Sequence, residues 1–153
     1  MMYAAPHTTR LEPSDLLELF PERVPPRSVM VIDDSPTVRA VVEATLHREG
    51  IQVSAYRDGL AALGALQRHE VDIPDVVLID IGMPKMDGYE IAKILRSKDD
   101  MERSVLLMLS AHDGVLDKLR AKMVGANGFI AKPFRAPFLL ETVLMYLNAG
   151  AVM

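Results

Sequence analysis

From residue 28 onward, short apolar runs alternate with segments in which apolar residues recur every three or four positions. The apolar runs predict strands at residues 29–32, 51–56, 76–79, 105–109 and 128–131. The periodic segments predict helices at residues 36–49, 59–69, 88–97, 113–124 and 136–147. Because the strands are apolar throughout, we expect a parallel sheet covered by helices on both faces. The alternation therefore predicts an α/β fold, a three-layer sandwich with right-handed crossovers.

Residues 1–27 differ in composition from the rest of the chain, because they contain five of its ten prolines. Within them only Ser14–Phe20 combines a capping residue with an apolar cluster, which predicts a short helix that is unstable by itself in water. We therefore divide the chain into a Pro-rich N-terminal extension (1–27) and one domain (28–150). Two interpretations of the extension are open. It is either a tail whose apolar face docks on the domain, or a partner-docking motif or dimerisation arm.

The composition excludes several classes of protein. Half of the 153 residues are hydrophobic and a quarter are charged, which is typical of a globular domain. No apolar stretch approaches the roughly 20 residues that span a bilayer, and the N-terminus lacks the features of a secretory signal. We therefore expect a cytoplasmic protein without membrane insertion. The absence of cysteine excludes disulfides and thiolate sites, and the net charge of −4 argues against direct nucleic-acid binding.

Polar side chains follow four of the five predicted strands. Asp33 and Asp34 come after the first strand, Asp80 after the third, Ser110 after the fourth and Lys132 after the fifth. In an open parallel sheet, ligands bind outside the carboxyl ends of the strands. If these four strands are neighbours, the five residues converge on one edge of the sheet.

Each of these residues also has a structural explanation. The pair Asp33 and Asp34 is favourable at a helix start, and Asp80 is a common turn former. Ser110 could be the N-cap of the next helix, and Lys132 could be a solvated surface charge. Together they are harder to explain structurally, because four separate strands place a polar residue at the same edge.

The five residues are chemically complementary. Three neighbouring carboxylates repel one another, and a hard divalent cation such as Mg²⁺ removes that conflict through oxygen ligands and retained waters. A carboxylate can accept a phosphoryl group to give an aspartyl-phosphate, and the cation offsets charge on the phosphoryl oxygens. Lys132 and Ser110 would supply a charged and a neutral donor to those oxygens.

Over residues 28–148 the sequence resembles the receiver domain of bacterial two-component response regulators. The motifs that carry the resemblance are Asp33-Asp34, the run from Asp80 to Gly88 (DIGMPKMDG), Ser110-Ala111 and Lys132-Pro133-Phe134. The resemblance implies a flavodoxin-like fold, a doubly wound sheet of five parallel strands in the order 2-1-3-4-5, flanked by five helices. It also implies a single-domain response regulator that accepts a phosphoryl group from a histidine kinase.

The resemblance assigns roles residue by residue. Asp80 matches the phospho-acceptor, Asp34 the direct ligand of Mg²⁺, and Asp33 the carboxylate that reaches the metal through water. Gly82 stands where the family uses a backbone carbonyl as a metal ligand. Such a domain catalyses only its own phosphorylation and dephosphorylation, so it is not an enzyme acting on other substrates.

The switch residues follow in the same way. Ser110 matches the hydroxyl that moves toward the phosphoryl group, Phe129 the switch aromatic, and Lys132 the family's lysine. The peptide before Pro133 is usually cis in this family, which would aim Lys132 inward. Positions that vary within the family are Gly82 and His112, and we predict that both affect the lifetime of the phosphoryl group.

A finer resemblance concerns the segments 34–37 and 108–114 and the triplet 124–126, which are similar to regulators of chemotaxis-type pathways, particularly of type IV pilus twitching motility. We expect no attached DNA-binding or enzymatic domain. Output is therefore expected through a downstream effector or motor protein, a phosphorylation-dependent homodimer, or onward phosphotransfer.

Other classes of function are disfavoured. Aspartyl-phosphate phosphohydrolases usually need a second acid two residues after the nucleophile, where this chain has Gly82. A flavin-binding electron carrier would need a small, hydroxyl-rich first loop. A pseudo-receiver, an interaction module that never binds phosphate, has no reason to keep the complete acidic pair, acceptor, hydroxyl and lysine, but it is the alternative to a phosphorylated switch.

Overall fold

The computed structural model describes residues 27–150 as a sheet of five strands with five α-helices and one 3-10 helix. The strands are β1 (Ser28–Ile32), β2 (Gln52–Tyr56), β3 (Val76–Asp80), β4 (Val105–Ser110) and β5 (Gly128–Ala131). The helices are α2 (Pro36–His47), α3 (Gly59–Gln67), α4 (Gly88–Arg96), η1 (Asp99–Met101), α5 (Val115–Met123) and α6 (Ala136–Gly150). Residues 14–20, for which a short helix is predicted, lie outside the described range. The domain boundary at residue 27 stays a prediction.

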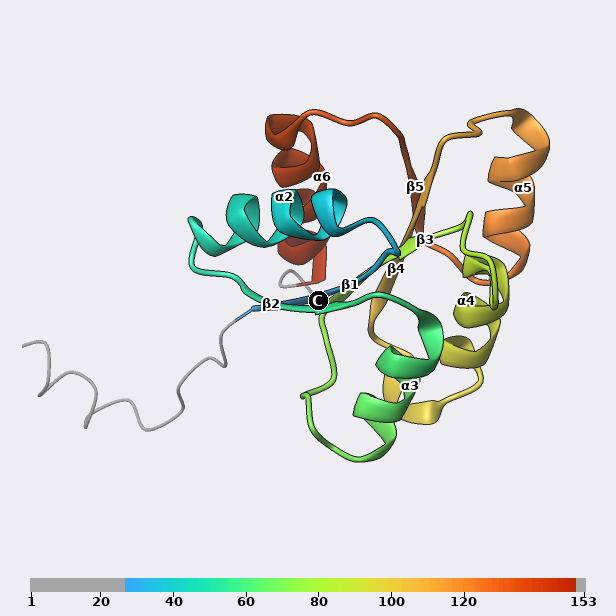
Figure 1. The fold of residues 1–153 in the computed structure, drawn as a ribbon, viewed down its shortest axis with the longest axis horizontal. Coiled ribbons are helices and arrows are strands. Elements are labelled where there is room, and N and C mark those ends of the chain that lie inside the picture. The colour runs from blue at the N-terminus through green and yellow to red at the C-terminus, as the bar shows by residue number, and fades with distance from the viewer. Residues whose placement is uncertain (1–26, 151–153) are drawn as a thin grey trace, which may run out of the picture.

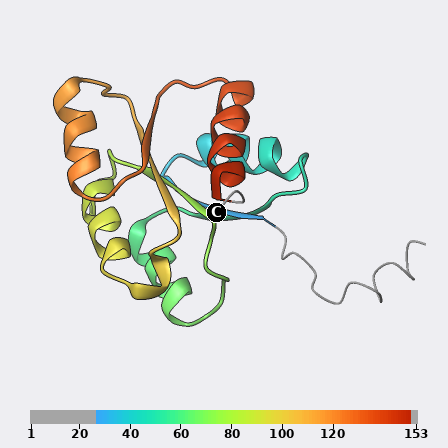
Figure 2. The ribbon, with the colours of Figure 1, turned by 180° about the vertical axis from the view of Figure 1, so that it is seen from behind.

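All strands are parallel, and their order is β2-β1-β3-β4-β5. Figure 1 shows α2 and α6 together on one face of the sheet and α3, α4 and α5 on the other, and the view from behind in Figure 2 agrees. The predicted α/β sandwich and its 2-1-3-4-5 order are therefore confirmed. Every element predicted within residues 27–150 is present, and no end differs by more than three residues.

Two apolar cores lie on the two faces of the sheet, because alternate residues of each strand point to opposite sides. One core joins Met30, Val77 and Met108 to the inner faces of α3 and α4. The other joins Val31 and Leu78 to α2 and α6. All five residues of β3 are buried, since this central strand contributes to both cores. Its last residue is Asp80, so the buried sheet carries a carboxylate to its edge.

Side-chain caps fix where three helices begin. The oxygens of Ser35, Asp58 and Asp87 accept from backbone N–H groups of the first turns of α2, α3 and α4. The helix predicted over residues 113–124 begins only at Val115 and has Gly114 as its N-cap residue, without a side-chain cap. No helix of the described range is long and apolar enough to cross a membrane.

Candidate phosphoryl-acceptor site

The strand order brings the five predicted polar residues to one edge. β1, β3, β4 and β5 are consecutive neighbours in the sheet, and the carboxyl ends of all four lie at the same rim. Asp33 is fully buried, Asp80 and Ser110 are almost fully buried, and Asp34 is exposed. The convergence expected from the sequence is therefore present in the structure.

Lys132 connects the first and third strands at this rim. Its Nζ donates to Asp33 Oδ2 at 2.6 Å and to Asp80 Oδ1 at 3.0 Å. Its side chain is only 19% exposed, so the alternative of a solvated surface charge is wrong. An ammonium shared by two buried carboxylates partly neutralises a negative cluster that would otherwise be costly to bury.

Charge and burial act against each other at Asp80. Burial raises the pKa of its carboxyl, Lys132 opposes that rise through its hydrogen bond, and the nearby Asp33 raises the pKa further. For Lys132, burial alone would lower the pKa, but the hydrogen bonds to Asp33 and Asp80 outweigh burial and raise it. The Asp80 carboxylate thus sits in an environment that is still short of positive charge.

Ligand oxygens of Asp33, Asp34 and Asp80 all lie within 4.8 Å of one another. Three carboxylates at this separation are an oxygen-only donor set, which suits a hard divalent cation that keeps several waters. Burial raises the pKa of Asp80 and repulsion from Asp33 raises it further, and a second positive charge would oppose both effects. The residues present therefore fit a Mg²⁺ ion.

Ser110 lies beside the end of β3, because β4 pairs with β3 in a register that places Asp80 opposite Leu109. Its Oγ accepts from the backbone N–H of His112 at 3.0 Å. Since the N-cap residue of α5 is Gly114, the alternative that Ser110 caps this helix is wrong. Ser110 is instead the last residue of the buried strand β4, and its hydroxyl lies at the rim.

The remaining predicted residues occupy different environments. Gly82 is exposed, and a Cβ added there would meet no atom within 4 Å. His112 is exposed in the loop that follows β4. Phe129 is half-buried and packs against the core that joins the sheet to α3 and α4. The Lys132–Pro133 peptide bond is cis, as the family resemblance implies.

The loop after Asp80 is held by a close backbone contact. A Cβ at Gly88, the first residue of α4, would lie 2.4 Å from the carbonyl oxygen of Asp80. Only glycine allows the helix to approach the end of β3 this closely. The position of Asp80 is therefore set in part by the packing of α4.

Comparison with known proteins decides the family. The sequence profile of the response regulator receiver domain matches residues 29–144. The chain belongs to this family. The receiver domain is 34% identical to Protein PilG of Pseudomonas aeruginosa over 115 residues, which cover 75% of this chain and 83% of that protein.

Solved structures support the same assignment. The chemotaxis protein CheY4 of Vibrio cholerae superposes on the receiver domain with a TM-score of 0.74 and 33% identity, covering 79% of this chain and 98% of that one. A response regulator from Chloroflexus aurantiacus superposes with a TM-score of 0.73 and 29% identity, over 80% and 98% of the two chains. The expected likeness to chemotaxis-type regulators is therefore confirmed. Receiver domains in general are regulators that interact with histidine kinases and downstream effectors, rather than enzymes.

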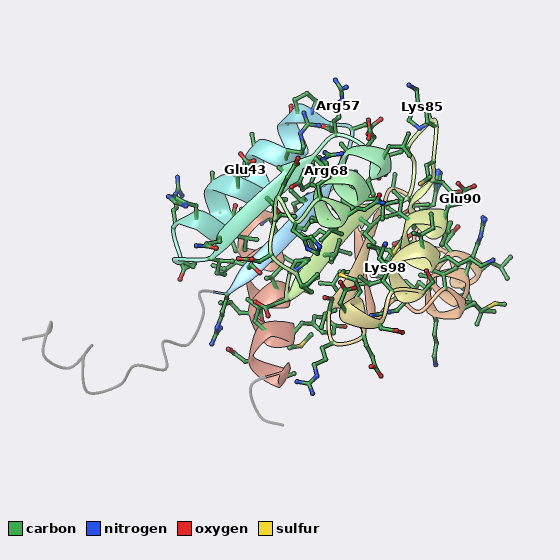
Figure 3. All side chains as sticks on the ribbon, turned by 90° about the horizontal axis from the view of Figure 1, so that it is seen from below. Glu43, Arg57, Arg68, Lys85, Glu90 and Lys98 are labelled. Carbon is green, nitrogen blue, oxygen red and sulfur yellow. The ribbon has the colours of Figure 1, made fainter. Side chains whose placement is uncertain are left out.

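Two features of the rim were not predicted from the sequence. Arg39 of α2 donates from Nη1 to the backbone oxygen of Asp33 at 2.7 Å and so holds the first loop. A hollow of about 210 Å³ lies next to Asp34, between the loops that follow β2 and β3. Figure 3 shows Arg57 and Lys85, which line this hollow, at the same edge of the molecule. The sequence gives no signal for either feature, because both depend on how loops from different strands meet.

Proposed function

We propose that this receiver domain is a phosphorylation-controlled switch that accepts a phosphoryl group from a histidine kinase on Asp80. The observation that carries the proposal is the convergence of the three carboxylates with Lys132 and Ser110 at one buried rim. A carboxylate oxygen of Asp80 forms a bond to phosphorus as the P–N bond of the phosphohistidine breaks. The imidazole leaves and takes up a proton.

Asp33, Asp34 and Asp80, with the backbone carbonyl of Gly82, would hold Mg²⁺. The ion would offset negative charge on the phosphoryl oxygens. Lys132 already lies within hydrogen-bonding distance of Asp80 and can donate to the incoming group without leaving the site. These roles rest on the match to the family's motif together with the geometry of the rim.

Ser110 and Phe129 are the proposed switch residues. The hydroxyl of Ser110 now accepts a single backbone N–H, and it can rotate to donate to a phosphoryl oxygen. Phe129 is half-buried at a position of β5 next to Met108 of β4, so it can follow a movement of the β4 end. The equilibrium between two arrangements would shift on phosphorylation.

Docking surfaces for the partners lie on both sides of the rim. An apolar hollow of about 410 Å³ is lined by Lys132 together with Val38, Val41 and Phe134. This hollow suits a kinase helix that carries the phosphohistidine. The face formed by α5, β5 and α6 bears the large exposed apolar residues Leu116, Met123, Phe138 and Met145, among others. Such a face is suited to a downstream effector, a motor protein or a second copy of the chain.

Because the chain is similar to chemotaxis-type regulators, we place the switch in a motility pathway, and twitching motility remains a prediction.

Intact-protein mass after incubation with acetyl phosphate tests the proposal. Wild type should gain one phosphoryl group in the presence of Mg²⁺ and none in EDTA, and Asp80→Asn should gain none. Asp100→Asn, which changes an exposed carboxylate on η1, is the matched control and should behave like wild type. No gain in wild type after rapid sampling would favour the pseudo-receiver. Hydrolysis of a simple phosphomonoester, which is not a phosphodonor for a receiver, would indicate a phosphohydrolase.

A further inference from the structure

A groove of about 670 Å³ lies between the C-terminal ends of α4 and α5. These two helices lie side by side in both Figure 1 and Figure 2. Met123, which is 78% exposed, and Val124 give the groove an apolar wall. Lys93, Arg96 and Arg120 line the rest of it, and no carboxylate is among its described lining residues. The groove is therefore both apolar and strongly basic.

The three cations are not neutralised within the described part of the chain, residues 27–150, where no carboxylate lies within 4 Å of them. Arg96 donates to neutral acceptors, among them the carbonyl oxygens of Gly125 at 2.8 Å and Ser104 at 2.9 Å. The Arg120 guanidinium lies over the ring of Tyr89, 4.2 Å from its centroid. A ligand that is acidic and apolar would complement this surface.

The chain itself contains such a ligand. Residues 11–22, which we call the acidic segment, carry four carboxylates and no cation. The same segment has five large apolar residues, Leu11, Leu16, Leu17, Leu19 and Phe20. It lies outside the described residues and precedes β1 by a short Pro-rich stretch. We propose that the acidic segment binds in the groove between α4 and α5 of the same chain.

The acidic segment can reach the groove. The start of β1 is two strand positions from the start of β4, about 10 Å at the usual strand spacing. Ser104, just before β4, is in direct hydrogen-bond contact with Arg96 of the groove. The eight-residue step from Phe20 to Ser28 can span about 26 Å when extended. The connection is therefore long enough, and its shortness gives the segment a high effective concentration at the groove.

A second hollow lies closer to the start of β1, but its charge does not suit the acidic segment. It has a volume of about 490 Å³, and Ser28 itself lines it. Its described lining has no lysine or arginine and includes the carboxylates of Glu70 and Asp72. Arg68 pairs with Glu70, but Asp72 would repel an acidic ligand. Charge therefore selects the groove between α4 and α5 over the nearer hollow.

Docking there would change α5. Of its nine residues only Ala121 is buried, whereas Val115, Leu116, Leu119 and Met123 are more than half exposed. A helix with so little buried surface opens locally at low cost in free energy. The bound segment would cover Met123 and add ion pairs to Arg120, so it would hold a helix that belongs to the proposed output face.

A spin label on the full-length chain tests the proposal. Because the sequence has no cysteine, Ser14→Cys provides a single attachment point for a nitroxide. We expect broadening of the amide signals of residues 93–97 and 120–125, with Gln52 and His69 of the nearer hollow unaffected. Unlabelled ¹⁵N protein mixed with labelled ¹⁴N protein should show no broadening. Broadening at the nearer hollow, or spread evenly, would overturn the proposal. Broadening of the groove signals in the mixture would also overturn it, because the segment would then bind a second copy of the chain.

Charge exchange supplies a second test. Reversing Lys93 and Arg120 to Glu should remove the broadening at the groove, and adding Asp15→Lys and Glu18→Lys should restore it. Lys118→Glu is the matched control, because two residues along a helix turn it about 200° away from Arg120. It should leave the broadening as it is in wild type. Broadening that survives the double reversal would refute the charge-based docking. The measurement does not require phosphorylation, so it tests the docking separately from the proposed switch.

Discussion

Replacing Lys132 by methionine tests whether the buried rim depends on this one ammonium group. Methionine keeps an unbranched side chain of similar length but removes the charge that Asp33 and Asp80 share at 2.6 and 3.0 Å. Removing one partner of a buried ion pair costs about 3–5 kcal/mol, because it leaves a buried charge without compensation. Since the Lys132 side chain is 19% exposed and water can reach it, we expect a loss near the lower limit, about 3 kcal/mol.

The measurement is urea unfolding at neutral pH in EDTA, for wild type and Lys132→Met. Lys122→Met, which removes an exposed lysine of α5 with no carboxylate nearby in the described chain, should change stability by less than about 0.5 kcal/mol. The comparison separates the effect of the shared ion pair from the general effect of losing one positive charge.

Mg²⁺ should reduce the difference between the two proteins. Without Lys132 the carboxylate cluster is more negative, so the ion should bind the variant more tightly and stabilise it more. Each tenfold gain in affinity narrows the gap by about 1.4 kcal/mol. A loss below about 1 kcal/mol in EDTA, or a gap that saturating Mg²⁺ leaves unchanged, would refute this account of the rim.

Three further changes have defined outcomes. Because burial and Asp33 raise the pKa of Asp80, the native state holds more protons than the unfolded state just above the usual carboxyl range, and stability falls as pH rises through that window. Asp80→Asn should therefore raise Tm at pH 7 in EDTA, with the gain vanishing in acid, and a lower Tm at pH 7 would contradict this. A Cβ at position 82 has no atom within 4 Å, so Gly82→Asn should fit without strain. Its side chain should cover the flank of Asp80 and lengthen the phosphoryl half-life severalfold, which a decay series by mass spectrometry checks. Arg96→Met leaves several carbonyl oxygens, including that of Gly125, without a donor and should cost about 3 kcal/mol in urea unfolding, and a loss below 1 kcal/mol would count against it.

The fold could be predicted because local and global signals agree. The runs 29–32 and 76–79, which form most of β1 and β3, are apolar throughout, as expected for a parallel sheet covered on both faces. The sequence predicts the start of α5 two residues early, at Asp113, whereas the helix begins at Val115 after Gly114, which has no side chain to mark the cap. The 3-10 helix η1 was missed, since three residues give no periodicity to detect.

The members of the site could be predicted, but not all of their contacts. Strand ends gave Asp33, Asp80 and Lys132, because the carboxyl ends of parallel strands meet at one rim. The contact of Arg39 with the Asp33 backbone depends on how α2 packs over β1, which no local pattern encodes. Similarly, the basic groove at α4 and α5 joins residues about 30 positions apart, and only the tertiary structure brings them together.

The close contact between Gly88 and the backbone of Asp80 makes the position of the Asp80 carboxylate depend on a residue that has no side chain. Any larger residue there would have to displace either α4 or the backbone of Asp80, since a Cβ would fall 2.4 Å from its carbonyl oxygen. In a mutational screen for signalling, position 88 would then score like a site residue, although it has no side chain with which to donate, accept or ligate. A Gly88→Ala protein would keep the carboxylates, the lysine and the hydroxyl and yet present them at the wrong positions. Loss of activity in such a screen therefore reports the placement of an acceptor as readily as its identity.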